Sequence, residues 1–387
     1  MGIHGLNDIL KKFGKINTVS LSRYSGQKVT VDVNIYLHQF VYNTYNKGKG
    51  SHIRGFFEMI VAFKKNGVEP IFIFDGRAPT AKGGTLESRF DIKQNKYSRI
   101  ENLVGEIIAI AKKSAVSNGE TAVETEVPVD LESLLAHTDN LSADDLKLIT
   151  EKQAEIEKID KTIIKVNSSM YSDLKELFEY TGVPYYVASG EADALCVAFC
   201  KCGIAAAVFS EDMDILAHGS PVLVRGINSN GFRKEGQLNE YNLAELLTEL
   251  NLSHDQFIDV CILCGCDYCG KIEKVGSITA LKLVRQYHDL ENIVSKIHRK
   301  ELPYECGDNF GVNFRVAQQL FKTLWSAENA VAHDLVVKPP NYDILQTFLT
   351  TKSNYTTKTV AKKFSELPRS GGSSLRKKIV IARREHR

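Results

Sequence analysis

Short apolar runs with acidic residues at their ends recur along this 387-residue chain. Burying a carboxylate costs free energy unless a cation meets it, and several carboxylates together repel one another. Acids gathered at the ends of buried strands therefore predict a bound cation. Because all the candidate ligands are oxygens, the expected ion is Mg²⁺ or Mn²⁺ rather than zinc. The acids concerned are Asp32, Asp75, Glu191, Asp193, Asp212, Asp214 and Asp267.

Turn residues bound these runs, and helical patterns separate them. VTVDV precedes a helical pattern near 52–65 and then PIFIFDG; PYYVAS, a helix from 191, AAAVFS and PVLVRG follow in the same alternation. This alternation predicts an α/β fold with a mostly parallel central sheet and helices on both faces. Ligands of such sheets bind at the carboxyl ends of the strands. Acids that are distant in sequence can therefore share one crevice.

Two pairs of acids are expected to differ in local geometry. In an extended segment, Asp212 and Asp214 point to the same side and face one crevice together. Glu191 and Asp193 begin a helix, where residues two apart face different ways. We therefore expect the second pair to occupy the first helical turn and to reach different metals or waters.

A long insertion separates Asp75 from Glu191. The two residues are 116 positions apart, far more than a strand-to-helix connection needs. Both ends of the insertion have helical patterns, whereas 114–145 contains eight acidic residues and no Lys or Arg. That composition predicts a mobile loop held away from nucleic acid. The flanking helices are the alternative DNA contact, through Lys93, Lys96 and Arg99.

The segment after Asp267 predicts a second basic contact. GKIEKVGSITALKLVRQY has the pattern of a turn followed by a basic amphipathic helix. Two helices around a tight turn commonly hold a nucleic-acid backbone. The candidate contacts in the turn are Lys271 and Lys274.

The distribution of charge separates a basic C-terminal tail from an acidic remainder. Eleven Lys/Arg and two Glu give residues 352–387 a charge of +9, which leaves −7 for the rest of a chain of net charge +2. The tail is predicted to be a flexible arm for phosphate or a nuclear address, or a solvated terminus. With no membrane-length apolar stretch and no signal-peptide pattern, we expect an intracellular protein.

Four of the eight cysteines form a C-x2-C-x-C-x2-C pattern, which superficially resembles a thiolate metal site. FIDVCILCGCDY instead predicts an apolar helix ending at Gly265, in which cysteine behaves as a small hydrophobic residue. The zinc or iron–sulfur alternative lacks a second cysteine pair at the proper spacing. The four residues are Cys261, Cys264, Cys266 and Cys269.

Several ordered blocks resemble the flap endonuclease family, the structure-specific 5′ nucleases that include XPG-type nucleases and 5′ to 3′ repair exonucleases. The blocks are MGIHGL, VDVNIYLHQF, FIFDGRAPTAK, GVPYYVASGEADALC, SEDMDILAHGSPVLVRG and CILCGCDY, and the resemblance spans most of residues 1–300. It implies a PIN-like nuclease core with a helical arch and a helix-turn-helix DNA-binding element. It also implies hydrolysis of DNA at 5′ flaps or ends, in replication, repair or recombination.

The resemblance assigns roles residue by residue. It implies metal-coordinating or metal-orienting roles for all seven acids, around two Mg²⁺ ions for which Mn²⁺ can substitute. Lys82 and Arg89 match the basic pair at the base of the arch that engages the scissile phosphate. His38 matches a ring that stacks on the nucleotide beside the cut, and its IYLHQF context is closer to the exonuclease branch. Processed Gly2 lies near the active site in the family.

The chain also departs from the family pattern. Residues 274–279, KVGSIT, replace the first glycine and the basic pair of the family's turn, so its monovalent-ion site and duplex grip are not carried over. No sliding-clamp box occurs in the tail, and we expect a monomer. Such divergence suits a large DNA virus or an outlying cellular lineage. The expected location is the nucleus in a cell, or the host nucleus or a cytoplasmic replication site for a virus.

Three alternatives stay open: an exonuclease or junction resolvase of the same family, a PIN-like ribonuclease, and a non-catalytic protein that binds branched DNA. The partner expected in most of these cases is branched or 5′-ended DNA.

The predicted parts are a nuclease core at 1–90 and 166–260, a helical arch at 91–165 with an acidic loop at 114–145, a helix-turn-helix element at 261–300, a C-terminal helical part at 301–351 and a basic tail at 352–387.

Overall fold

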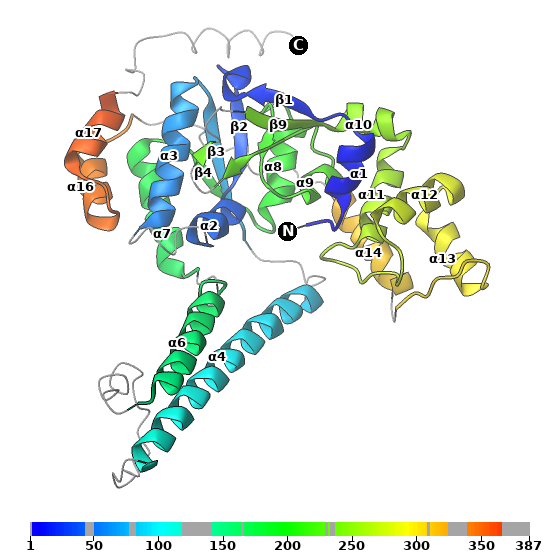
Figure 1. The fold of residues 1–387 in the computed structure, drawn as a ribbon. Helices are drawn as coiled ribbons and strands as arrows, with labels where there is room; N and C mark the ends of the chain where they lie inside the picture. The colour runs from blue at the N-terminus through cyan, green and yellow to red at the C-terminus, as the bar shows by residue number, and fades with distance from the viewer. Residues whose placement is uncertain are drawn as a thin grey trace. The chain divides into compact units, whose positions relative to one another are not determined.

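The chain folds into two compact units, which are described separately (Figure 1). The first comprises residues 1–81 and 166–387, and the second comprises 82–165. The second unit begins before position 91, where the sequence analysis places the boundary, because helix α4 is continuous from Gly83. The computed structural model describes residues 2–42, 50–76, 83–117, 141–163, 166–228, 231–232, 237–307, 310–323 and 339–365.

A seven-stranded sheet in the order β1-β9-β6-β5-β2-β3-β4 forms the centre of the first unit. Strands β6, β5, β2, β3 and β4 are parallel, whereas β9 pairs antiparallel with both β6 and β1. The predicted mostly parallel sheet is therefore confirmed, with an antiparallel edge that the sequence analysis did not foresee. The strands are β1 (Asn17–Ser20), β2 (Lys28–Asp32), β3 (Glu69–Phe74), β4 (Tyr185–Val187), β5 (Val208–Phe209), β6 (Val222–Arg225) and β9 (Gln237–Asn242), beside a separate pair β7 (Ile227–Asn228) and β8 (Gly231–Phe232).

Alternate residues of each strand enter different hydrophobic cores. In β3, Ile71 and Ile73 join one core, while Phe72 and Phe74 join the other. Because side chains of a strand alternate in direction, each face of the sheet needs its own cover of helices. Helices α8 to α14 line the first core, and α2, α3, α7 and α16 line the second.

The helices of the first unit follow the predicted alternation. The predicted helices near 52–65 and from 191 correspond to α3 and α8, and the apolar helix predicted to end at Gly265 is α11, whose C-cap is Gly265. The helices are α1 (Leu6–Phe13), η1 (Leu21–Tyr24), α2 (Val33–Tyr42), α3 (Ser51–Lys65), α7 (Ser168–Thr181), α8 (Ala192–Lys201), α9 (Asp214–Ala217), α10 (Leu243–Leu250), α11 (His254–Cys264), α12 (Ser277–Tyr287), α13 (Leu290–His298), α14 (Phe310–Lys322), α16 (Tyr342–Lys352) and α17 (Thr357–Ser365).

The second unit is a pair of long antiparallel helices, α4 (Gly83–Ser117) and α6 (Ala143–Asp160), drawn side by side in Figure 1. Leu103, Ile107 and Ile149 are buried between them. Both ends of the insertion are therefore helical, as the sequence predicts. Most of the acidic loop lies at 118–140, outside the described residues.

The prediction that the tail is flexible from residue 352 is wrong for its first part. Residues 357–365 form α17, which packs through Val360, 0% exposed, and through Phe364 against Phe57 of α3. The apolar side chains in this stretch outweigh its basic composition, because they complete the core around α3. Residues 366–387 lie outside the described part of the chain. Within the described ranges, no helix is long and apolar enough for a bilayer crossing.

Candidate active site

Asp32 and Asp75 meet at the carboxyl edge of the parallel strands. The register pairs Asp32 with Ile73, two residues before Asp75, so both acids project from the same face. Asp32 Oδ1 accepts the backbone N–H of Asn34 at 2.9 Å, and Asp75 Oδ2 accepts the Asn34 side-chain amide. Ser210, just after β5, donates its hydroxyl to Asp32 Oδ2 at 3.2 Å. Three strands thus bring their ends to one place.

Asp212 and Asp214 follow β5 and lie beside Gly2. Asp212 Oδ1 accepts the backbone N–H of Asp214 at 3.0 Å, and Asp214 begins the short helix α9. The expectation of an extended segment is therefore wrong, because the Asp212 side chain closes a turn with the backbone two residues further on. Both carboxylates nevertheless face one place, since a Cβ at Gly2 would lie 1.9 Å from Asp212 Oδ1 and 2.6 Å from Asp214 Oδ1.

Glu191 and Asp193 stand at the start of α8, next to Asp75. Glu191 is the N-cap residue and Asp193 lies in the first turn, as predicted. The backbone N–H of Ala192 donates to Asp75 Oδ1 at 2.7 Å. Because a helix N-terminus favours negative charge, the first turn of α8 offsets part of the repulsion among these acids.

Asp267 lies in the turn that follows α11. An antiparallel bridge between Cys266 and Cys269 closes this turn, so that Asp267 and Tyr268 occupy its two central positions. The Tyr268 hydroxyl donates to Glu191 Oε2 at 2.6 Å, which ties the turn to the start of α8. The structure thus connects Asp267 with the other acids through its neighbour.

The acids of the site raise the pKa values of buried neighbours. Burial raises the pKa of Asp32 to about 7, and the charges of Asp75 and Asp212 act in the same direction. Burial also raises the pKa of the Cys196 thiol on α8, and the charges of Asp32 and Asp193 raise it further. The acids of β2, β3, β5 and α8 therefore share one electrostatic environment.

The donor set fits a hard divalent cation, because it consists of carboxylate oxygens that repel one another in the cation's absence. Throughout the described segments, no three acidic, His or Cys side chains already surround a common point as metal ligands would. Their oxygens accept N–H and O–H donors of the chain instead, as those of Asp32 and Asp75 do. Which carboxylates hold which ion therefore stays a prediction.

The predicted basic contacts of the arch are only partly described. Lys82 lies outside the described residues, and Arg89 is on α4 with its side chain outside them. Lys93 is exposed on the same helix. Lys96 Nζ donates to the Thr162 carbonyl at 3.3 Å, and Arg99 pairs with Glu155 at 2.9 Å, both within the second unit. These last two side chains stabilise the helix pair, and their predicted DNA contacts remain predictions.

The other predicted DNA contacts lie in the first unit. His38 is half-buried on α2. The Lys271 stem packs on Gly265, whose added Cβ would lie 2.2 Å from Lys271 Cε. Lys274 has a positive φ of 63° in the turn before α12, where the family's glycine is missing. The turn and the basic helix predicted after Asp267 are thus present.

The cysteines behave as the apolar-helix interpretation predicts. Cys261 and Cys264 are buried on α11, and burial raises the pKa of Cys264 to about 12. Burial also raises the pKa of Cys266 to about 11, with the charges of Asp214 and Asp267 acting in the same direction. Cys261 and Cys264 therefore serve as small hydrophobic residues in the core around α11.

Three polar residues at the site were not singled out from the sequence. Asn34, Ser210 and Tyr268 each hydrogen-bond to one of the seven acids. Each stands within two positions of a predicted acid, and this adjacency is the signal that could have identified them. By contrast, Glu211 of SEDMD turns away and accepts the backbone N–H groups of Gly226 and Ile227.

Comparisons with known proteins agree with this geometry. The XPG N-terminal domain model matches residues 1–96, and the XPG I-region model matches residues 182–267. Flap endonuclease 1 of Glycine max is 30% identical over 381 residues, covering 95% of this chain and 86% of its own length. Flap endonuclease 1 of Micromonas commoda is 28% identical over 384 residues, covering 96% and 86%.

Solved structures share the fold. The catalytic core of Rad2 in complex with a DNA substrate matches with a TM-score of 0.67 at 18% identity, covering 95% of this chain and 100% of its own. Flap endonuclease-1 of Methanococcus jannaschii matches with a TM-score of 0.59 at 22% identity, covering 92% and 96%. The fold and the acids at its strand ends define a metal-dependent, structure-specific 5′ nuclease. The chain belongs to the flap endonuclease family.

Proposed function

We propose that this nuclease hydrolyses DNA phosphodiesters at 5′ flaps or 5′ ends during replication, repair or recombination. The observation that carries the proposal is the meeting of Asp32 and Asp75 at one strand edge, where the charges of Asp75 and Asp212 act on the buried Asp32. The names of the similar proteins support it, since three of the four are flap endonucleases and the fourth is a catalytic core in complex with a DNA substrate.

The acids would hold two Mg²⁺ ions, or Mn²⁺ in their place. We assign Asp32, Asp75, Glu191 and Asp193 to one ion, and Asp212, Asp214 and Asp267 to the other. When bound, such a pair activates a water and stabilises charge on the leaving oxygen. Seven carboxylates and two divalent ions sum to −3, an excess that basic residues have to offset.

Side chains of the chain supply the rest of the chemistry. We assign Lys82 and Arg89 to clamp the scissile phosphate, because charge grows on its oxygens in the transition state. The water oxygen loses a proton and bonds to phosphorus as the bond from phosphorus to the leaving oxygen breaks. The leaving oxygen takes up a proton. His38 is assigned to stack on the nucleotide beside the cut. Gly2 is assigned to the DNA contact through its backbone, because Asp212 and Asp214 fill the space that a side chain would need.

A processive 5′ to 3′ exonuclease is the second candidate. The observation that favours it is the His38 ring on α2, in a context closer to the exonuclease branch of the family. The partner in both cases is branched or 5′-ended DNA, and we expect a monomeric protein. If the chain is cellular, we propose that it works in the nucleus.

One substrate panel tests the proposal. Flap, nicked, gapped, blunt and four-way junction DNAs, each labelled at the 5′ end, are digested with Mg²⁺ and with EDTA. We expect Mg²⁺-dependent products whose lengths mark cutting at the flap base, whereas release of the labelled 5′ mononucleotide would assign the exonuclease. An RNA flap of the same sequence tests the ribonuclease alternative. Binding of the DNAs without any cleavage would indicate a non-catalytic DNA-binding protein.

Two matched variants test the site. Asp212→Ala removes a proposed ligand, and Asp8→Ala removes an exposed acid in the first turn of α1. We expect Asp212→Ala to abolish flap cleavage and Asp8→Ala to retain it. Cleavage by Asp212→Ala at the parental rate would refute the assignment of the acids.

A further inference from the structure

Tyr268 stands out among the residues around the acids because its hydroxyl contacts one of them directly. The side chain is 5% exposed, and its hydroxyl donates to Glu191 Oε2 at 2.6 Å. Glu191 is the N-cap residue of α8, but its carboxylate makes no capping hydrogen bond to the helix. The Tyr268 hydroxyl is therefore a partner that orients this carboxylate from outside the helix that carries it.

The position of Tyr268 is itself well determined. Its ring packs edge-on against Phe321 of α14, with centroids 5.2 Å apart, and Phe321 is 1% exposed. Its backbone lies in the turn closed by the Cys266–Cys269 bridge. Because side chain and backbone are both held, the Tyr268 hydroxyl is a fixed point against which a carboxylate can be oriented.

The chemistry of the donor suits a site that has to attract cations. A Lys or Arg at this place would cancel the charge of Glu191, whereas a phenol donates a hydrogen bond and leaves that charge intact. A phenol keeps its proton at neutral pH, so the Tyr268 hydroxyl is a lasting donor to Glu191 Oε2.

We propose that Tyr268 is a positioning residue that orients the Glu191 carboxylate toward a divalent cation and fixes the distance from Glu191 to Asp267. This inference rests on the proposed function, in which Glu191 and Asp267 serve different ions. Because Asp267 and Tyr268 are consecutive in one turn, a single hydrogen bond couples the two groups of ligands.

The chain contains a matched control. Tyr24 is 4% exposed and donates its hydroxyl to Glu240 Oε2 at 2.5 Å, on β9, which lies next to the edge strand β1 and away from the strand ends of the site. Glu240 also pairs with Arg23 at 2.8 Å. Tyr24→Phe therefore removes the same kind of buried hydrogen bond without touching a proposed ligand.

The test compares Tyr268→Phe, Tyr24→Phe and the parental protein. Mn²⁺ binding is measured by calorimetry and by the metal-induced shift in melting temperature, and flap cleavage is measured against Mn²⁺ concentration. We expect Tyr268→Phe to need about tenfold more Mn²⁺ for half-saturation in both assays, the low end for loss of a hydrogen bond to a ligand. The KM for DNA at saturating Mn²⁺ should stay unchanged, and Tyr24→Phe should titrate like the parent.

The outcomes separate this inference from the proposed function. A parental protein that neither binds Mn²⁺ nor cuts DNA overturns both. If the parent does both and Tyr268→Phe shows the parental Mn²⁺ dependence, only the role of Tyr268 is overturned. Should Tyr268→Phe fail to fold, Phe321→Leu decides, because loosening the ring should raise the Mn²⁺ requirement in the same direction, and an unchanged requirement overturns the role.

Discussion

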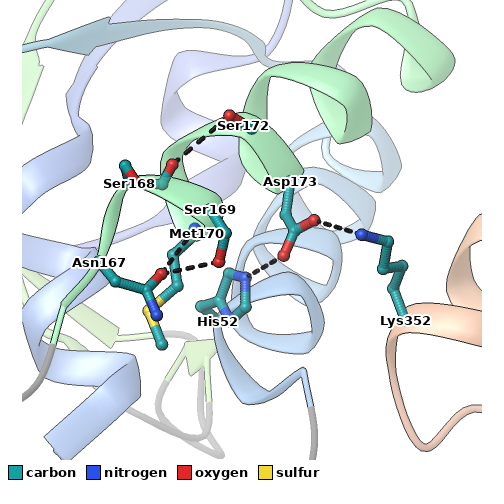
Figure 2. A network of polar contacts seen from close by, with 8 residues as sticks. All are labelled: His52, Asn167, Ser168, Ser169, Met170, Ser172, Asp173 and Lys352. Atoms are coloured by element: carbon teal, nitrogen blue, oxygen red, sulfur yellow. Dashed lines mark hydrogen bonds and ion pairs between the residues drawn. The ribbon is translucent and has the colours of Figure 1, made fainter.

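The buried carboxylate of Asp173 and the carboxylates at the strand ends have different surroundings. Asp173, on α7, accepts from His52 Nε2 at 3.2 Å and pairs with Lys352 Nζ at 3.0 Å (Figure 2). The buried Asp32 meets a hydroxyl and backbone N–H groups, together with the charges of Asp75 and Asp212. Asp173 is matched by the protein's own basic groups, whereas the charges around Asp32 are those of other acids.

The difference separates a structural acid from a functional one. The Asp173 network joins α3, α7 and α16, and Figure 2 shows Asn167 capping α7 beside it, with the Met170 N–H donating to Asn167 Oδ1 at 3.1 Å. At the strand ends, burial and the charges of Asp75 and Asp212 raise the pKa of Asp32. Groups with strongly shifted pKa values are common at binding and catalytic sites.

The largest expected effect is on catalysis at Asp32. Asp32→Asn should lower the rate of flap cleavage by about 10³-fold, because it removes several kcal/mol of metal-dependent stabilisation of the transition state. In EDTA its free energy of unfolding should rise by about 1 kcal/mol, because a repelled buried charge is gone. Cleavage assays and urea titrations measure the two quantities. An Asp32→Asn variant that is active and less stable than the parent would show that Asp32, like Asp173, serves stability.

Cation binding should be the next largest effect. Mn²⁺ at a hundredfold excess over its dissociation constant should raise the free energy of unfolding by about 2.7 kcal/mol in the parental protein. Asp32→Asn should respond much less, whereas Asp173→Asn should respond fully. Thermal melts with Mn²⁺ and with EDTA measure this. Equal responses from all three proteins would place the cations away from the strand ends.

Asp173→Asn should lower stability with little change in catalysis. The substitution weakens the bonds to His52 and Lys352 and leaves buried donors poorly matched, so unfolding free energy should fall by about 1–3 kcal/mol. Flap cleavage at 25 °C should stay within about twofold of the parental rate, since α3, α7 and α16 are held by apolar packing as well. Urea denaturation and initial rates test this, and a large loss of activity in a folded variant would contradict it.

The smallest effect should be a pH dependence from His52. Burial lowers the pKa of His52 and outweighs the opposing effect of Asp173. A histidine with a lowered folded-state pKa stabilises the protein above its unfolded pKa, and this contribution is lost as the pH falls. Between pH 7.5 and 5.5 the urea midpoint of the parent should therefore drop more than that of His52→Gln. Parallel midpoints in the two proteins would show that His52 does not titrate there.

Much of the architecture was predictable because apolar periodicity reports burial directly. The strands ending near Asp32 and Asp75 and the helix after Glu191 follow from local pattern, and the edge at which they meet follows from parallel topology. The antiparallel edge formed by β1 and β9 was not predictable in this way. Those two strands pair over a separation of more than 200 residues, and nothing local in the sequence marks such a partner.

The errors at the site and the tail have physical causes. Asp212 and Asp214 left the extended conformation because a side-chain oxygen captured a backbone N–H, and this local hydrogen bond competes with strand geometry. The basic stretch around Val360 folded because burying a few apolar side chains on α3 outweighed its charge. Sequence composition describes average tendencies, whereas these outcomes depend on particular partners.

Gly2 occupies a position that has no space for a side chain. An added methyl carbon at Gly2 would lie 1.9 Å from an Asp212 oxygen, and the backbone φ of 83° strains any residue that has a side chain. Alanine at position 2 would therefore push the Asp212 carboxylate aside, so a scan of the acids should include this glycine.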